Sequence, residues 1–155
     1  MLALRTSFVS LLYDEDDPVL DKPIIWGGGY GEPPLDSPAD LRAGQTFSLA
    51  CFVYSETEDD IQDNLVPVWQ ISKDEGFTWD DIDAATSTRH TSSWAGELYG
   101  AISGEIESRY FDVAWLITSG FQLDDVGQYR LKVTGGVLGE AFSSKVRIRL
   151  DSNPG

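Results

Sequence analysis

Cationic, sulfur-containing and imidazole side chains are scarce in this chain. Its 155 residues include 11 lysines and arginines against 26 acidic residues, one cysteine and one histidine, and the formal charge is −15. Nucleic acids and anionic membranes bind clusters of lysine and arginine, so this balance argues against both as partners. A single cysteine cannot form an internal disulfide, which is typical of proteins that fold in a reducing compartment.

Long apolar runs are missing too. Residues 1–17 hold only a short apolar stretch, which ends in four acids and has no small-residue cleavage site. The stretch is too short to span a bilayer, so we expect neither a signal peptide nor a membrane anchor. The acid excess predicts a solvated, self-repelling surface. Adaptation to high salt is a second interpretation, because aspartates outnumber glutamates and lysines are few.

Aromatic residues and turn formers are abundant by contrast. The chain has five tryptophans, six tyrosines and seven phenylalanines, together with fifteen glycines and seven prolines. This composition, with few stretches of helical period, is typical of an all-β protein with many turns. A chain of this length forms one domain and buries a core without a disulfide or a metal.

The clearest strand follows Asp125. Tyr129, Leu131 and Val133 alternate with polar residues, which predicts a half-buried antiparallel strand. The preceding Asp125-x-Gly127 predicts a tight corner in which Gly127 adopts a dihedral that a side chain forbids. We expect Tyr129 to bury its ring and return its hydroxyl to the corner backbone, as in the tyrosine corner of Greek-key sandwiches.

A second clear strand covers residues 43–53. Its alternation places every second residue on a core face: Phe47, Leu49, Cys51 and Val53. We expect further strands at residues 66–71, 78–82, 108–111, 113–117 and 141–150. The polar stretch 83–104 is longer than a sandwich connection needs, so we interpret it as an insertion.

The order of these features resembles immunoglobulin domains of the I-set or V-set type. The resemblance rests on residues that match strands B and C and the E–F corner of that family: Cys51, Trp69, Asp125, Gly127 and Tyr129. It covers residues 39–150 and implies an immunoglobulin-like Greek-key β-sandwich with Trp69 at the centre of the core.

The chain departs from the family at Leu131, where a second cysteine is usual. We expect Leu131 to pack beside the Cys51 thiol and to fill the same space with apolar contacts. Arg109 is the expected ion-pair partner of Asp125 across the base of the sandwich.

Residues 72–79 resemble the Asp-box of sialidase-type propellers. The matching residues are Ser72, Asp74, Gly76, Thr78 and Trp79. The motif occurs once and the chain is too short for a propeller, so we interpret it as a hairpin turn without catalysis. Asp74 satisfies backbone groups, Gly76 adopts the strained dihedral, and Trp79 packs under the hairpin.

No other pattern predicts an enzyme or a cofactor. His90 has no nucleophile or acid at catalytic spacing. Acidic clusters at 14–17, 56–63 and 80–83 offer oxygen ligands for calcium, but none has EF-hand spacing, and a hydrated loop is the alternative.

Residues 1–38 follow no sandwich pattern, and we interpret them as an extended docking arm in which 6–13 form a short strand. The arm has more apolar side chains than a solvated tail should have: Phe8, Leu11, Leu12, Ile24, Ile25, Trp26 and Tyr30. We expect these side chains to bind a partner. Residues 151–155 form a short carboxyl-terminal tail.

Two functions fit these expectations. An immunoglobulin-like domain without an export signal or a disulfide resembles the decoration and accessory proteins of tailed-virus particles, which are made in the host cytoplasm. In that hypothesis the protein is a non-enzymatic virion component, present in multiple copies in a symmetric assembly and bound to other head or tail proteins. The alternative is an extracellular adhesion module that binds a host-surface glycan through Trp94 and Tyr99.

Overall fold

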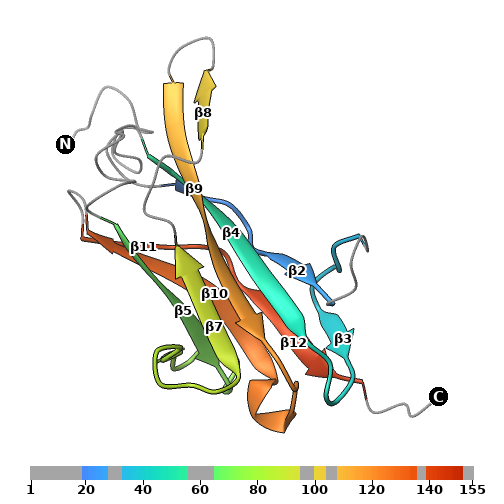
Figure 1. Ribbon diagram of the computed structural model, residues 1–155. Helices are drawn as coiled ribbons and strands as arrows, with labels where there is room; N and C mark the ends of the chain where they lie inside the picture. Colours follow the sequence, from blue (N-terminus) through green and yellow to red (C-terminus); the bar gives the residue numbers. More distant parts are fainter. Residues whose placement is uncertain are drawn as a thin grey trace.

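The computed structural model describes residues 19–27, 33–55, 65–94, 100–103, 108–135 and 139–151. These residues form two β-sheets that pack face to face, and they contain no α-helix (Figure 1). A single 3₁₀ turn, η2 (Leu123–Asp125), is assigned in these ranges. The expected all-β sandwich is therefore confirmed.

The first sheet has the strand order β1-β4-β9-β7, with β2 also paired to β4 and β8 to β9. Its strands are β1 (Val19–Leu20), β2 (Ile24–Trp26), β4 (Phe47–Ser55), β7 (His90–Trp94), β8 (Gly100–Ser103) and β9 (Ser108–Thr118). All of these pairs are antiparallel.

The second sheet has the order β3-β12-β10-β5-β6, with β11 also paired to β10. Its strands are β3 (Ala39–Leu41), β5 (Val66–Ser72), β6 (Asp80–Asp81), β10 (Gly127–Gly135), β11 (Gly139–Phe142) and β12 (Val146–Leu150). The β3–β12 pair is parallel, and the other pairs are antiparallel.

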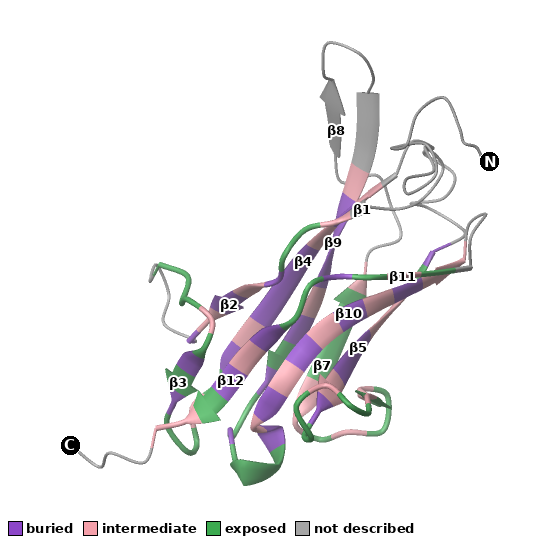
Figure 2. Ribbon diagram, turned by 180° about the vertical axis from the view of Figure 1, so that it is seen from behind, coloured by how far each residue is buried: buried purple, intermediate pink, exposed green. Residues whose placement is uncertain are grey.

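The core lies between the inner faces of the two sheets. Buried and less buried residues alternate along β4 and β10, as the sequence pattern predicts (Figure 2). Trp69, Cys51 and Leu131 belong to one buried cluster, and each is at most 2% exposed. Leu131 is the cross-strand neighbour of Trp69, and Cys51 is a free thiol. The expected disulfide-free core is confirmed.

The tyrosine corner is also confirmed. The buried Tyr129 hydroxyl donates to the Asp125 carbonyl oxygen at 2.5 Å. Gly127 has φ +155°, and a Cβ at this position would lie 2.4 Å from the Ser72 carbonyl oxygen. Gly127 is therefore required by the close approach of β5, because any side chain would collide with the neighbouring backbone.

The strand expected at 141–150 is divided into two, β11 and β12, which both pair with β10. Two further strand expectations are wrong. Residues 108–118 form one continuous strand, β9, instead of two strands at 108–111 and 113–117. The stretch 83–104 is not simply an insertion, because it contains β7, which pairs along β9. Neither outcome follows from alternation: Asp112 is polar yet lies on the core side of β9, and β7 has hydroxyl residues on both sides.

The boundary expected at residue 38 is wrong as well. β2 pairs with β4 of the same chain, and Ile25 is 1% exposed in the core. Residues 24–26 therefore belong to the sandwich, since Ile25 is buried without any partner protein. The other predicted arm contacts, Phe8, Leu11, Leu12 and Tyr30, lie outside the described residues, as does the strand expected at 6–13.

Candidate functional site: an aromatic sheet face

The outer face of the first sheet is the candidate site. Alternate residues of β4 enter the core, so Ala50, Phe52 and Tyr54 point to the opposite side. On β9, Val113 and Trp115 also point away from the core, because cross-strand neighbours share a side of the sheet. Phe52 is paired with Val113, and Ala50 with Trp115. We call this surface the aromatic face; its described side chains are Ile24, Trp26, Ser48, Ala50, Phe52, Tyr54, Thr91, Ser93, Phe111, Val113, Trp115 and Ile117.

Two tryptophans stack at one end of the aromatic face. The ring centroids of Trp26 and Trp115 are 5.6 Å apart with an interplanar angle of 27°. Trp26 comes from β2 and Trp115 from β9, and β4 runs between these strands with Ala50 opposite Trp115. Ala50 is only 1% exposed although it faces away from the core, which indicates that side chains on this face cover it.

Three further rings meet at the other end. The ring centroid of Phe111 lies 5.9 Å from those of both Phe52 and Tyr54, and the centroids of Phe52 and Tyr54 are 6.4 Å apart. Each such pair contributes about 0.5–1.5 kcal/mol beyond the burial of its area. Val113, the cross-strand neighbour of Phe52, is 5% exposed. The sheet thus has a small apolar layer on its outer side as well as on its inner side.

The described side chains of the aromatic face carry no charge, although the chain has a net charge of −15. At its margin, the Tyr54 hydroxyl donates to Asp21 Oδ2 at 2.9 Å. Burial, together with this carboxylate, raises the pKa of Tyr54 to about 12. Tyr54 therefore stays neutral at physiological pH, and the face remains uncharged.

Cys51 lies beneath this face, on the core side of β4. Its thiol donates to the Asp21 carbonyl oxygen at 3.3 Å. Burial, and to a lesser extent Asp21, raises the pKa of Cys51 to about 12. The thiol is therefore protonated and inert, since the thiolate is the reactive form.

The outer face of the second sheet has the opposite character. Four cations project from β10 and β12, and we call this the cationic face: Arg130, Lys132, Arg147 and Arg149. Lys132 pairs with Asp81 at 3.4 Å, and Arg149 with Asp40 at 2.8 Å. Arg147 pairs with Glu75. Exposed pairs of this kind contribute little to stability, about 0–1 kcal/mol each.

Arg130 is held more firmly than the other cations. Its guanidinium lies 4.2 Å from the centre of the Trp79 ring and 4.1 Å from that of Phe142. Its Nε also donates to Gln70 Oε1 at 2.8 Å. Trp79, the last residue of the Asp-box, therefore packs on this cation.

The rest of the Asp-box forms the predicted turn. Asp74 accepts from the Ser72 hydroxyl at 2.8 Å, and from the Thr78 backbone and hydroxyl at 2.8 and 2.6 Å. Gly76 has φ +89°, and its N–H donates to the Ser72 hydroxyl. The carboxylate of Asp74 is thus occupied by local turn contacts.

The expected pairing of Arg109 with Asp125 is wrong. The Asp125 carboxylate, 3% exposed, accepts two bonds from the Arg89 guanidinium at 2.6 and 2.9 Å. Arg109 lies opposite Ile102 near the far end of β9, about 30 Å along an extended strand from Thr118. Thr118 is at the Asp125 end, where its hydroxyl contacts His90 Nδ1 at 2.8 Å.

Burial alone would raise the pKa of Asp125, but the hydrogen bonds from Arg89 and from the Gln122 backbone hold it below its usual value. His90 Nε2 lies 3.7 Å from the same carboxylate. Burial lowers the pKa of His90 and outweighs the opposing effect of the Asp125 carboxylate, and Arg89 acts in the same direction as burial. The Thr118 hydroxyl beside His90 belongs to a residue that is 0% exposed, so the cluster offers no accessible nucleophile among the residues named here. The Arg89–Asp125 pair joins the base of the two sheets.

Metal and membrane sites find no counterpart in the described parts of the chain. In these ranges, no three histidine, cysteine, aspartate or glutamate side chains form a metal-binding group. The acidic clusters 14–17 and 56–63 lie outside the described residues, and the described cluster 80–83 forms no such group. None of the described helical residues forms a segment with the length and hydropathy required to cross a bilayer.

The sequence pattern singled out Trp26 but missed the partners that complete the face. Phe52, Tyr54, Phe111 and Trp115 are large aromatic residues at alternate positions of β4 and β9. A signal was present: both strands place aromatic residues on the side opposite to the core residues. Since a one-sided sheet should have polar residues there, aromatic residues on both sides indicate a surface that is covered.

No protein-family model and no curated protein matches the chain. The function is therefore inferred from the geometry and chemistry of the molecule itself.

Proposed function

We propose that this protein is a non-enzymatic docking module, an immunoglobulin-like accessory or decoration protein of a tailed-virus particle. The observation that carries the proposal is the uncharged aromatic face on a chain with a net charge of −15. On the outer face of the second sheet, by contrast, Lys132, Arg147 and Arg149 are ion-paired. The aromatic face binds the partner on the particle.

The physical basis is the composition of protein interfaces. Their centres are depleted in charge and enriched in aromatic residues, and tryptophan and tyrosine dominate the binding energy. The aromatic face has two tryptophans and Tyr54, and Ile117 at its margin is 41% exposed. An aromatic layer on an outer sheet face is a surface that a partner protein stabilises by removing it from water.

The strand order supports the immunoglobulin-like assignment. In such domains strands A, B, E and D face strands C, F and G. Here β2, β4, β9 and β7 form one sheet, and β5, β10 and β12 lie in the other.

The lack of a disulfide favours the virion proposal over a secreted module. Immunoglobulin-like domains act mostly outside cells, where a disulfide usually stabilises them. Cys51 is free and buried, so this core is stable in a reducing cytoplasm. Synthesis in a host cytoplasm followed by release on a particle reconciles the fold with its reduced core.

The glycan-binding alternative has less support. It relied on Trp94 and Tyr99 as a stacking platform. Trp94 packs against the core cluster, and Tyr99 lies outside the described residues. A core-packed indole is a poor platform for a sugar ring, because stacking needs an exposed face.

Co-sedimentation with virus particles depleted of this protein tests the proposal. We expect full-length protein to bind, and Trp115→Ala to bind at least about thirtyfold more weakly, a hot-spot loss of about 2 kcal/mol. Ile117→Lys, which adds a charge to the same face, should also bind weakly. Phe77→Ala is the matched control, because Phe77 is an aromatic residue that is 87% exposed in the turn of the other sheet.

Circular dichroism of each variant separates lost binding from lost folding. Particle binding by Trp115→Ala and Ile117→Lys at wild-type strength would overturn the proposal. Binding to glycans in place of particles, with the same variants unaffected, would favour the adhesion module.

A further inference from the structure

β7 is an edge strand with an open side. It pairs with β9 on one side, and no described strand lies beyond it. The backbone N–H of Ser119 donates to the Arg89 carbonyl oxygen at 3.0 Å. His90 is paired with Thr118 in the next register position. Backbone groups in an antiparallel ladder alternate in direction. Ser92 and Trp94 therefore direct their N–H and C=O groups away from β9, toward the open edge.

The first residue of this edge is already satisfied. The His90 N–H donates to the Ser87 hydroxyl at 2.9 Å, which agrees with the alternation. The His90 carbonyl and the backbone groups of Ser92 and Trp94 thus form a short row of donors and acceptors that no described strand pairs with. Such a row is a template for another strand.

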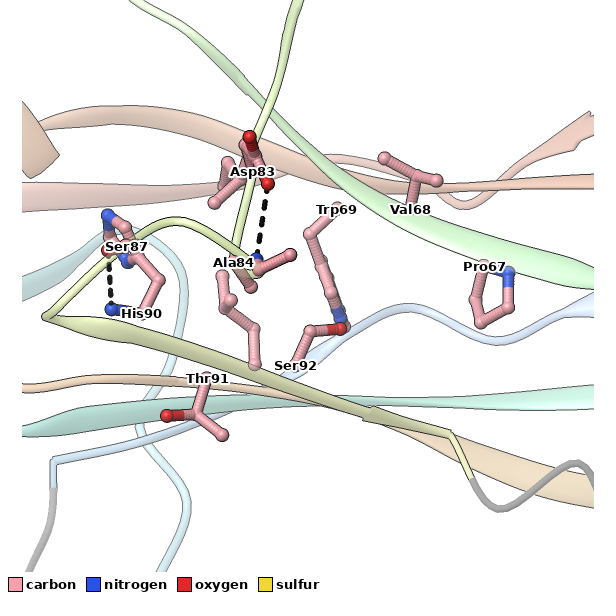
Figure 3. A pocket seen from close by; sticks show the side chains of 12 residues that line it. Pro67, Val68, Trp69, Asp83, Ala84, Ser87, His90, Thr91 and Ser92 are labelled. Atoms are coloured by element: carbon pink, nitrogen blue, oxygen red, sulfur yellow. Dashed lines mark hydrogen bonds between the residues drawn. The ribbon is translucent and has the colours of Figure 1, made fainter.

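A cleft of about 510 Å³ lies directly beside this row (Figure 3). β7 lines one side with Ser92, and the loop that follows β6 lines the other with Ala84 and Ser87. Trp69 of β5 and Leu116 of β9 contribute from the core. The cleft is therefore a gap between the two sheets at their open edge, and its volume lies in the range typical of ligand-binding clefts.

Trp69 supplies an independent indication that something binds here. The residue is 2% exposed, and its indole Nε1 is buried without a hydrogen-bond partner. A buried unpaired donor costs about 1–3 kcal/mol, which an acceptor entering the cleft would recover. A backbone carbonyl or a hydroxyl is such an acceptor.

The neighbouring edges are protected against strand pairing, and β7 is not. β6 consists of Asp80 and Asp81, and the open part of β5 contains Pro67, which has no N–H. The sequence of β7, His-Thr-Ser-Ser-Trp, has neither a charged residue nor a proline. The β7 edge is thus uncharged, although the chain has a net charge of −15.

We propose that residues 6–13 of a second copy add to the open edge of β7 as an extended strand and enter the cleft. These residues, Thr-Ser-Phe-Val-Ser-Leu-Leu-Tyr, form an uncharged run outside the described strands. They have the length and composition of a strand, and a strand needs a partner for its backbone groups. β7 offers that partner, with matching absence of charge.

The second copy is the source because of where the segment leads. Residues 1–18 end at β1, which lies at the opposite edge of the same sheet from β7. Within one copy, only residues 14–18 separate the segment from β1, so the chain would have to cross the width of the sheet within that short span. Between copies the contact joins two different surfaces, so it is heterologous and links copies in a ring or a row.

Disulfide trapping in the full-length protein tests this contact. Ser92→Cys is combined in turn with Ser7→Cys, Phe8→Cys, Val9→Cys and Ser10→Cys, and the proteins are oxidised mildly. Native Cys51 is 0% exposed and gives no background. We expect a ladder of linked oligomers on a non-reducing gel, with yields that alternate along residues 7–10 because alternate side chains share one side of a strand.

Each other outcome overturns the proposal. A disulfide within one copy would place the segment in its own molecule. Dimers from Ser92→Cys alone, at the yield of the double variants, would show that two β7 edges pair directly. Absence of crosslinks at every position would remove the segment from the cleft.

A second measurement needs no cysteine. Hydrogen exchange at the Ser92 and Trp94 amides of the wild-type protein should slow at least tenfold as the protein concentration rises. Ser92→Pro removes the N–H at the open edge and should abolish concentration-dependent assembly in light scattering. Ser93→Ala is the control, because the Ser93 backbone is directed toward β9. Exchange that is independent of concentration would contradict the contact.

Discussion

The two outer faces of the sandwich differ in how they are built. On the first sheet, aromatic rings from β2, β4 and β9 cover one another, and no described side chain of that face is charged. On the second sheet, cations of β10 and β12 each meet a carboxylate or a ring. The cationic face is satisfied within the molecule, whereas the aromatic face gains stability when a partner removes it from water.

This comparison also explains why the acid excess does not disrupt the fold. Cations of the second sheet are placed beside Asp40, Glu75 and Asp81, and the exposed pairs lower local repulsion. On the described outer face of the first sheet, charged side chains are absent. The molecule thus presents one face suited to water and one suited to protein contact.

The largest effect should come from removing β2, on which the aromatic face depends. Deletion of residues 1–38 removes Trp26 from the face and Ile25 from the core. We expect the free energy of unfolding to fall by at least about 3–5 kcal/mol, since loss of one large buried side chain costs that much. Urea denaturation checks this value.

Deletion of residues 1–18 is the matched control for that experiment, because it leaves β1 and β2 in place. We expect its unfolding midpoint to stay close to that of the full chain. Equal stability of the 1–38 deletion and the full chain would show that β2 contributes nothing, and the aromatic face would have to be redefined.

A somewhat smaller effect is expected where the two sheets meet. Arg89→Ala leaves the buried Asp125 carboxylate without its guanidinium. Breaking a buried pair costs about 3–5 kcal/mol, and because Arg89 is partly exposed we expect about 2–4 kcal/mol. Thermal unfolding of Arg89→Ala beside Arg109→Ala measures the difference. A larger loss for Arg109→Ala would contradict the observed pairing.

On the cationic face, Arg130→Ala removes a cation held between two rings. We expect a loss of about 1–2 kcal/mol of stability from the two contacts and unchanged particle binding. Arg149→Ala, which removes only an exposed pair, should change stability by less than about 1 kcal/mol. If Arg130→Ala lowered particle binding as Trp115→Ala does, the two faces would not differ in function.

The smallest effect is a dependence of stability on pH. His90 has a folded pKa below its unfolded value, so its contribution is present above about pH 6.5 and is lost as the pH falls. The folded pKa of Asp125 is also lowered, so its contribution to the free energy of unfolding is lost as the pH falls below about 4. We expect His90→Gln to remove the first decline and keep the second. Denaturant midpoints between pH 3 and 8 check this, and a wild-type stability that rose on acidification to pH 5 would contradict it.

The sequence by itself determined the parts of the fold that are encoded locally. Alternation along residues 47–53 and 129–133 identified the core faces of β4 and β10. The corner was predictable because Asp125, Gly127 and Tyr129 act within a few residues of one another. The turn at Ser72–Thr78 was predictable for the same reason.

Only the tertiary structure decided which distant residues meet. Alternation states which side chains share a face but not which strand lies beside it, so Arg89 rather than Arg109 pairs with Asp125. β7 has hydroxyl residues on both sides and no apolar period, and only pairing with β9 makes it a strand. Trp26 and Trp115 are 89 positions apart in the sequence. They stack because β2 and β9 lie on either side of β4, an arrangement set by long-range strand pairing and the burial of a shared core.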